Sequence, residues 1–189
     1  MKKHNIIIII IGMALVLASG TLFLCEYFGF FGAGYDPSAV TASLVERFGP
    51  RDVRPDGGFG SLVSDTMPVC EIGGVDTLGL IEVRDHSLAV LSSHYNSARD
   101  YRRLACHHSG SVGTSDLTLV SGKPFEFLST VDVGDPVTFT IATGEKYTYK
   151  VCEVHHPSVL KLDALDSKYS ASLVLVYKKA GANIVVMCE

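Results

Sequence analysis

Two short apolar runs near the end of the chain constrain its fold more than any other feature. The first run is Ser-Leu-Val-Leu-Val-Tyr at 172–177, and the second is Asn-Ile-Val-Val-Met-Cys at 183–188. Between them lie only five residues, one of which is Gly181. Runs rich in β-branched residues and separated by a short glycine-containing turn are typical of a β-hairpin. The tail therefore predicts two paired strands in a β-rich core.

Several earlier segments have the same short apolar character, and turn residues such as Gly, Pro and Asp separate them. The segments that we expect to form strands are 77–83, 86–91, 116–121, 137–142 and 146–154. Segment 159–165 is expected to be a helical or irregular crossover before the tail hairpin. Short strands at regular spacing with little helix are typical of a β-barrel or a β-sandwich. The sequence therefore predicts a mainly β domain of seven or eight strands over 64–189.

The N-terminus has the pattern of a membrane anchor. Lys2 and Lys3 precede a run from Ile6 to Cys25 that contains no charged residue. Twenty apolar residues in a helix span roughly 30 Å, the hydrocarbon thickness of a bilayer. Because positive residues stay in the cytoplasm, we expect residues 1–5 inside, 6–25 as a transmembrane signal-anchor and the rest outside. Cleavage near Ser19, or lipidation of Cys25, is a weaker alternative.

A short helix and a linker are expected between the anchor and the β domain, over 26–63. Asp36 is a candidate N-cap, Pro37 suits the first helical position, and Gly49-Pro50 ends the helical pattern. The segment 51–60 contains Pro55 and three glycines, which favours a linker.

Composition excludes some classes of function. The formal net charge is −4 at pH 7, whereas nucleic-acid binding calls for a basic face. Four of the five cysteines follow the anchor, and an even number in an oxidising location predicts one or two disulfides. The chain has no Cys-x-x-Cys, and its His107-His108 and His155-His156 pairs are adjacent, so that each pair points to opposite faces of a strand. We therefore predict no metal site and no cofactor.

Four segments, taken in order, resemble the sortase family over roughly 70–189. Asp-Leu-Thr-Leu-Val-Ser-Gly-Lys at 116–123 resembles the sortase stretch that ends in Gly-His. Val133-Gly-Asp-Pro and the later Tyr-Thr-Tyr-Lys-Val resemble the family's Gly-Asp strand and its hairpin partner. Ser-Leu-Val-Leu-Val at 172–176 stands where sortases carry Thr-Leu-x-Thr-Cys, and Asn183 stands where they carry Arg. The resemblance implies a sortase-like closed β-barrel with short helices.

Sortases cleave a sorting signal with a cysteine thiolate, aided by a histidine and an arginine, and pass the acyl group to an amine. The positions that match these three residues hold Lys123, Val176 and Asn183 in this chain. Because an isopropyl group cannot attack a carbonyl, the resemblance implies a protein that has lost catalysis. It would use the old groove, with Lys123, Leu175, Val176 and Asn183 as candidates, to bind a peptide, a pilin-like protein or another sortase. By the same resemblance, Cys106 would pair with Cys188, which leaves Cys70 and Cys152 as a second pair.

Two alternatives remain open. The protein could be an active transpeptidase that uses a displaced residue, either one of the cysteines or a serine that pairs with Lys123, namely Ser121 or Ser172. It could also be a structural protein of the cell envelope in which the barrel is a spacer.

Overall fold

The computed structural model describes residues 12–13, 16, 19–20, 35–48, 67–92, 100–113, 117–162, 165–179 and 181–189. Contacts divide the chain into two units, Met1–Gly34 and Tyr35–Glu189. Most of the anchor predicted at 6–25 lies outside the described residues, as does the linker predicted at 51–60. No helix within the described part of the chain has the length and hydropathy that a membrane span requires.

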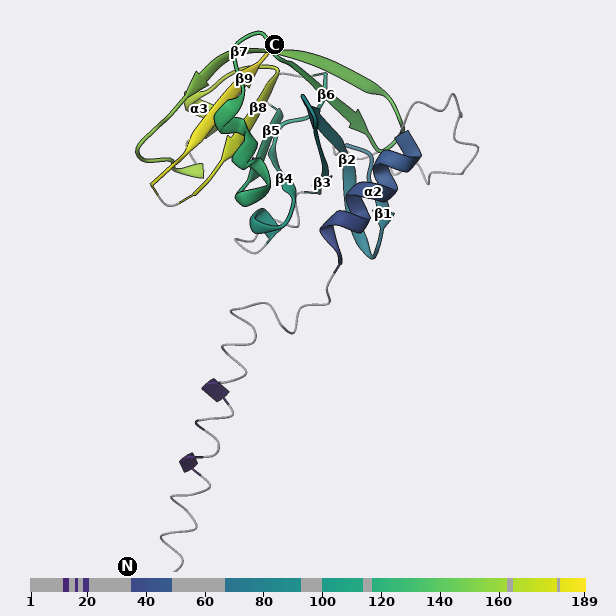
Figure 1. The fold of residues 1–189 in the computed structure, drawn as a ribbon, viewed down its shortest axis with the longest axis vertical. Helices are drawn as coiled ribbons and strands as arrows, with labels where there is room; N and C mark the ends of the chain where they lie inside the picture. Colours follow the sequence, from purple (N-terminus) through teal and green to yellow (C-terminus); the bar gives the residue numbers. More distant parts are fainter. Residues whose placement is uncertain are drawn as a thin grey trace, which may run out of the picture. The chain divides into compact units, whose positions relative to one another are not determined.

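Among its described residues, the second unit has nine strands and four helical segments (Figure 1). The strands are β1 (Cys70–Ile72), β2 (Val75–Val83), β3 (His86–Leu91), β4 (Ala105–Ser109), β5 (Leu117–Ser121), β6 (Pro136–Ile141), β7 (Lys146–His155), β8 (Leu173–Tyr177) and β9 (Ile184–Cys188). The helical segments are α2 (Pro37–Phe48), the 3-10 helices η1 (Asp100–Arg102) and η2 (Lys123–Thr130), and α3 (Leu165–Lys168).

Eight of these strands close into a barrel. Their order is β2-β3-β4-β5-β8-β9-β7-β6, and the sheet closes because β2 also pairs with β6, while β1 pairs with β2 alone. The closed barrel of seven or eight strands that the sequence predicted is therefore confirmed, with eight. The predicted tail hairpin is also confirmed, because β8 and β9 pair antiparallel from Leu173 opposite Cys188 to Tyr177 opposite Ile184.

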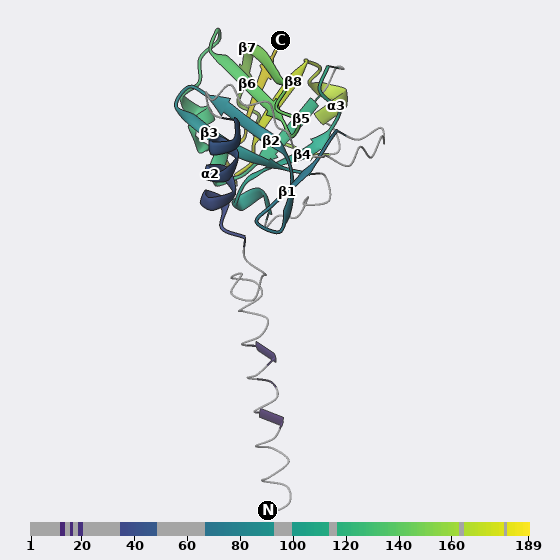
Figure 2. The ribbon, with the colours of Figure 1, turned by 90° about the vertical axis from the view of Figure 1, so that its right-hand side faces the viewer.

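Hydrophobic side chains form one cluster inside the barrel and two on its outer face. The interior cluster includes Leu119, Phe139, Leu175 and Val186. Helix α2 covers one outer cluster, and the connection from β7 to β8, residues 156–172, covers the other. Figures 1 and 2 show α2 and α3, which belongs to this connection, on opposite sides of the barrel.

Helix α2 begins as its sequence predicts. The Asp36 carboxylate accepts hydrogen bonds from the Ser38 amide at 2.9 Å and the Ser38 hydroxyl at 2.6 Å, as an N-cap does. Val40 and Leu44 are buried against β2 and β3. The helix thus lies in the same compact unit as the barrel, which begins at Tyr35, whereas the sequence placed the start of the barrel domain at residue 64.

Gly79 lies where β2 pairs with both β3 and β6, the pairing that closes the barrel. It lies at a register shift in β2 and pairs with Val90 of β3 and with Ile141 of β6. Its φ is +153°, and a Cβ atom there would lie 1.9 Å from the carbonyl oxygen of Thr140. Only glycine fits this conformation and this close approach of two backbones.

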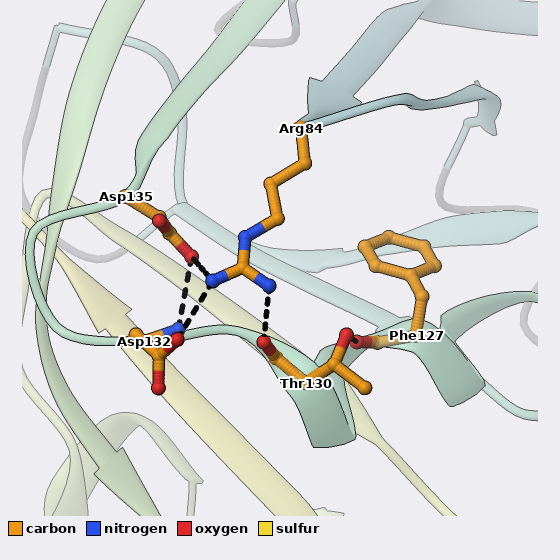
Figure 3. A network of polar contacts seen from close by, with 5 residues as sticks. All are labelled: Arg84, Phe127, Thr130, Asp132 and Asp135. Carbon is orange, nitrogen blue, oxygen red and sulfur yellow. Dashed lines mark hydrogen bonds and ion pairs between the residues drawn. The ribbon is translucent and has the colours of Figure 1, made fainter.

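An arginine in the β2–β3 turn fastens η2 to the start of β6 (Figure 3). The Arg84 guanidinium forms ion pairs with Asp132 at 2.8 Å and Asp135 at 2.7 Å, and it donates a hydrogen bond to the Thr130 carbonyl. Asp135 also accepts a hydrogen bond from the Asp132 amide at 2.9 Å. We call these four residues the Arg84 clamp. It includes Asp135 of the Gly-Asp pair that the sequence analysis singled out.

Candidate functional site

Strand β8 carries two of the four residues predicted to line a groove, and its alternation sends them to opposite faces. Leu175 points into the barrel and belongs to the interior cluster. Val176 points outward and packs with Val120 of β5 and Val185 of β9, which are its register partners on the neighbouring strands. Leu175 and Val176 are both 0% exposed. Neither side chain therefore lines an open groove, contrary to the sequence expectation.

The β7–β8 connection explains why the outward face is closed at Val176. Its residues Leu165, Tyr169 and Ala171 are buried in the same outer cluster as Val176. A side chain at position 176 is therefore separated from solvent by a packed layer. A reactive group there would need that layer to move before a substrate could reach it.

Asn183 and Lys123, the other two predicted residues, differ in their surroundings. Asn183 comes just before β9, and its side-chain amide donates a hydrogen bond of 3.2 Å to the Pro157 carbonyl of the connection. Lys123 is exposed at the first position of η2, whose Phe125 and Leu128 belong to the interior cluster. Val176 and Asn183 thus both face the β7–β8 connection, while Lys123 starts a helix that packs on the interior cluster.

The four cysteines of the described unit are free thiols in the structure, so the predicted disulfides are not found. Cys106 lies in the outer cluster under α2, together with Cys70, whereas Cys188 lies in the interior cluster. Cys106 and Cys188 therefore lie on different faces of the sheet. The thiol of Cys152 donates a hydrogen bond to the Met187 carbonyl at 3.2 Å.

Three of the cysteine thiols, those of Cys106, Cys152 and Cys188, are poorly suited to nucleophilic attack. Burial raises the pKa of the Cys188 thiol to about 12, and it raises the pKa of Cys106 further still. The pKa of the half-buried Cys152 is also raised, chiefly by desolvation. Because the thiolate is the nucleophile, a raised pKa leaves little reactive species at neutral pH.

The serine next to Lys123 does not form a catalytic pair with it. Ser121 is fully buried, and its hydroxyl lies 3.0 Å from the Leu104 carbonyl and 3.2 Å from the Tyr101 carbonyl. A hydroxyl that donates to backbone carbonyls serves as a structural tie. Ser121 therefore fastens η1 and the start of β4 to the end of β5.

A pocket of about 480 Å³ opens on the outer face where β7, β9 and α3 meet. Its lining residues come from the end of β7, the β7–β8 connection and β9; they are Glu153, His155, His156, Pro157, Lys168, Tyr169 and Met187. None of the four predicted groove residues lines it, although Asn183 is hydrogen-bonded to Pro157. The alternation of strand β7 places Glu153 and His155 on one side, a signal that could have found half of the lining. Sequence periodicity does not indicate the connection that completes the pocket.

Comparison with known proteins is informative only for solved structures, since no family model and no curated protein matches the chain. The similar structures are sortases. Sortase C1 of GBS pilus island 1 is 15% identical with a TM-score of 0.47, and the match covers 61% of this chain and 64% of that chain, which is less than two thirds of it.

Two further sortase structures match over more of their length. A lid mutant of Streptococcus agalactiae sortase C1 is 16% identical with a TM-score of 0.47, covering 79% of this chain and 81% of that chain. Clostridium perfringens sortase C, in a complex with the C-terminal cell wall sorting signal motif, is 13% identical with a TM-score of 0.46, covering 89% and 90%.

Proposed function

We propose that this chain is a membrane-anchored, extracytoplasmic sortase-like protein that binds a peptide or protein segment at the cell envelope and catalyses no transpeptidation. The observation that carries the proposal is the full burial of Val176, the residue that the sequence resemblance matches to the family's cysteine. An aliphatic side chain supplies no nucleophile. The layer of Leu165, Tyr169 and Ala171 over it leaves no access for an acyl group.

The neighbouring positions support the same reading. Asn183 lacks the fixed charge that an arginine would offer to a developing oxyanion. Its amide is already engaged with the Pro157 carbonyl. Lys123 stands where the family has histidine and is exposed, so it lacks the burial that is typical of a catalytic lysine base.

A role in the envelope rests on the N-terminal pattern of two lysines and an uncharged apolar run. Such a segment inserts with its positive end in the cytoplasm, which would leave the barrel outside. Fractionation of cells that express the full chain, followed by protease treatment of intact cells, tests this placement. The barrel should be degraded from outside, whereas protection of the whole chain would contradict the orientation.

The direct test of lost catalysis uses the full chain with a sorting-signal peptide and an amine acceptor. We expect no cleaved peptide and no amide product by mass spectrometry, and no covalent adduct after exposure to a thiol-directed sulfonate. An active sortase in the same assay is the positive control. Turnover by the wild-type chain would contradict the proposal and support the alternative of a displaced nucleophile.

A further inference from the structure

The pocket between β7, β9 and α3 has the size and shape of a ligand site. Its volume of about 480 Å³ lies within the roughly 300–1,000 Å³ that is usual for ligand pockets. It is too small for a folded partner but large enough for two or three side chains of a peptide. It also lies beyond β9 from Val176, so that its occupancy does not depend on access to position 176.

The apolar part of the pocket is well anchored. Tyr169 is only 6% exposed, and Tyr169 and Met187 both pack in the outer cluster that buries Val176. The His155 ring lies 5.4 Å from the Tyr169 ring, centroid to centroid, at an interplanar angle of 48°. Two rings and a thioether thus form a surface against which an apolar or aromatic side chain can pack.

The polar part of the pocket has an excess of donors. The one carboxylate in the lining, Glu153, is engaged by the His155 ring, with Nε2 and Oε2 2.8 Å apart. The Lys168 ammonium lies 5.2 Å from the centre of the Tyr169 ring, and no carboxylate among the described side chains forms an ion pair with it. His156 is exposed in the lining as well. Charge complementarity therefore favours a ligand with a carboxylate.

The position where sortases carry arginine contributes to this pocket indirectly. The Asn183 amide holds the Pro157 carbonyl at 3.2 Å, and Pro157 belongs to the pocket lining. Asn183 is thus a positioning residue, because it ties the start of the connection to the residue before β9.

We propose that this pocket binds a peptide segment in which a carboxylate side chain stands beside an apolar or aromatic one. The carboxylate would meet the Lys168 ammonium, and the apolar neighbour would pack on Tyr169 and Met187. This inference rests on the proposed binding function and assigns it a place and a ligand chemistry.

The test uses the full chain labelled with ¹³C at its methionine methyl groups. The chain has four methionines, so the spectrum is simple; Met187 reports on the pocket and Met67, which packs on the interior cluster, is an internal control. The probes are acetyl-Ala-Phe-Glu-Ala-amide and its glutamine counterpart. A Met187→Leu variant assigns the signal.

We expect the glutamate peptide to shift the Met187 signal and leave Met67 in place. The glutamine peptide should bind roughly two- to fivefold more weakly, as expected for the loss of an exposed ion pair. Lys168→Gln should weaken binding of the glutamate peptide by the same factor. Lys161→Gln makes the same charge change in the same connection but outside the lining, and should leave the dissociation constant unchanged.

Three outcomes would overturn the inference: an unmoved Met187 signal at millimolar peptide, equal affinity for the two peptides, or equal effects of the two lysine variants. Each of these outcomes can be distinguished from a failure of the proposed loss of catalysis. Transpeptidation by the wild-type chain would refute lost catalysis at Val176, yet charge-dependent peptide binding at Met187 would still support the pocket.

Discussion

At the scale of single residues, Gly79 carries the closure of the barrel. Its φ of +153° and the 1.9 Å approach of a virtual Cβ to the Thr140 oxygen are two separate obstacles to any side chain. A rotamer change cannot relieve the second obstacle, because the position of a Cβ is fixed by its own backbone and the atom that it meets is the backbone oxygen of Thr140. The short apolar run at 77–83 predicted a strand here, but nothing in it indicated that this glycine joins two neighbouring strands.

We expect Gly79→Ala to destabilise the barrel by about 3 kcal/mol or more, since a backbone clash adds to left-handed strain. The control is Gly113→Ala, where φ is +78° but nothing lies within 4 Å of the added Cβ; strain alone should cost about 1 kcal/mol. The measurement is urea unfolding followed by circular dichroism, because the chain has no tryptophan. Equal losses of unfolding free energy in the two variants would show that the contact between β2 and β6 at Gly79 tolerates a side chain.

The thiols give a second prediction at this scale. In a Cys25→Ser background without reductant, four thiols should react in denaturant, whereas in the native protein Cys152 should react first and the buried Cys70, Cys106 and Cys188 slowly. An aromatic disulfide reagent gives both counts. Fewer than four thiols in denaturant would indicate disulfides and contradict the structure.

The pH dependence of stability follows from the same burial. The pKa of Cys188 rises from 9.0 to about 12 on folding, so the protonated thiol is favoured in the fold. This contribution is complete below pH 9 and is lost as the pH rises toward 12. Between pH 9 and pH 12, the free energy of unfolding should therefore fall less steeply with pH in Cys188→Ala than in the wild type.

At the scale of elements, the Arg84 clamp fixes how η2 sits against the barrel. Two further contacts link the clamp to β3 through η2. Within η2, the Thr130 hydroxyl donates a hydrogen bond to the Phe127 carbonyl at 2.8 Å. The Phe127 ring in turn stacks on the His86 ring of β3, with ring centroids 4.3 Å apart. The turn before β3 and the end of η2 are thus joined by one set of contacts. Lys123 begins the helix that these contacts hold.

We expect the clamp to be sensitive to acid. Hydrogen bonds from the Asp132 amide and from Arg84 lower the pKa of Asp135. Its contribution to stability is therefore present above the usual carboxyl pKa and is lost as the pH falls through the lowered value. Asp135→Asn should lower the melting temperature at pH 7, and the difference from wild type should shrink at acid pH. The neighbouring Asp85→Asn is the control, and a pH-independent difference would contradict this account.

Helix α2 should behave as part of the barrel. Leu44 is fully buried between α2 and the sheet, so Leu44→Ala should cost about 2 to 5 kcal/mol. Val45 lies on the same helix but is 41% exposed. Val45→Ala should therefore lower the free energy of unfolding by less than about 0.5 kcal/mol. Urea unfolding in a single transition, shifted only in the Leu44 variant, would agree. A small effect of Leu44→Ala would show that α2 is a separate appendage.

At the scale of the whole molecule, the barrel was predictable from the sequence and the pocket was not. Short alternating runs specify strands, and the ordered sortase-like segments specify how those strands follow one another. The covering role of the β7–β8 connection depends on tertiary packing of Leu165, Tyr169 and Ala171, which periodicity does not encode. The same packing buries Val176, and the pocket lies beyond β9.

The proposed loss of the catalytic site as a whole predicts that restoring a thiol alone does not restore chemistry. We expect Val176→Cys to give no transpeptidation, and its thiol to react slowly with an aromatic disulfide reagent while the fold is intact. The triple variant with Lys123→His and Asn183→Arg should also be inactive, since the covering layer remains. Product from the single variant would show that the layer opens readily.

The pairing of β2 with both β3 and β6 also has a kinetic consequence. The β2–β6 pairs, such as Gly79 with Ile141, and the parallel β5–β8 pairs, such as Leu117 with Leu173, join residues far apart in sequence. Proteins dominated by such non-local pairings fold in milliseconds to seconds, more slowly than helical bundles of similar size. During synthesis, β2 must wait for β6 to be made before the barrel can close. We therefore expect the chain to leave the ribosome with apolar strands still unpaired, the state in which a chaperone or a translocation machine would meet it.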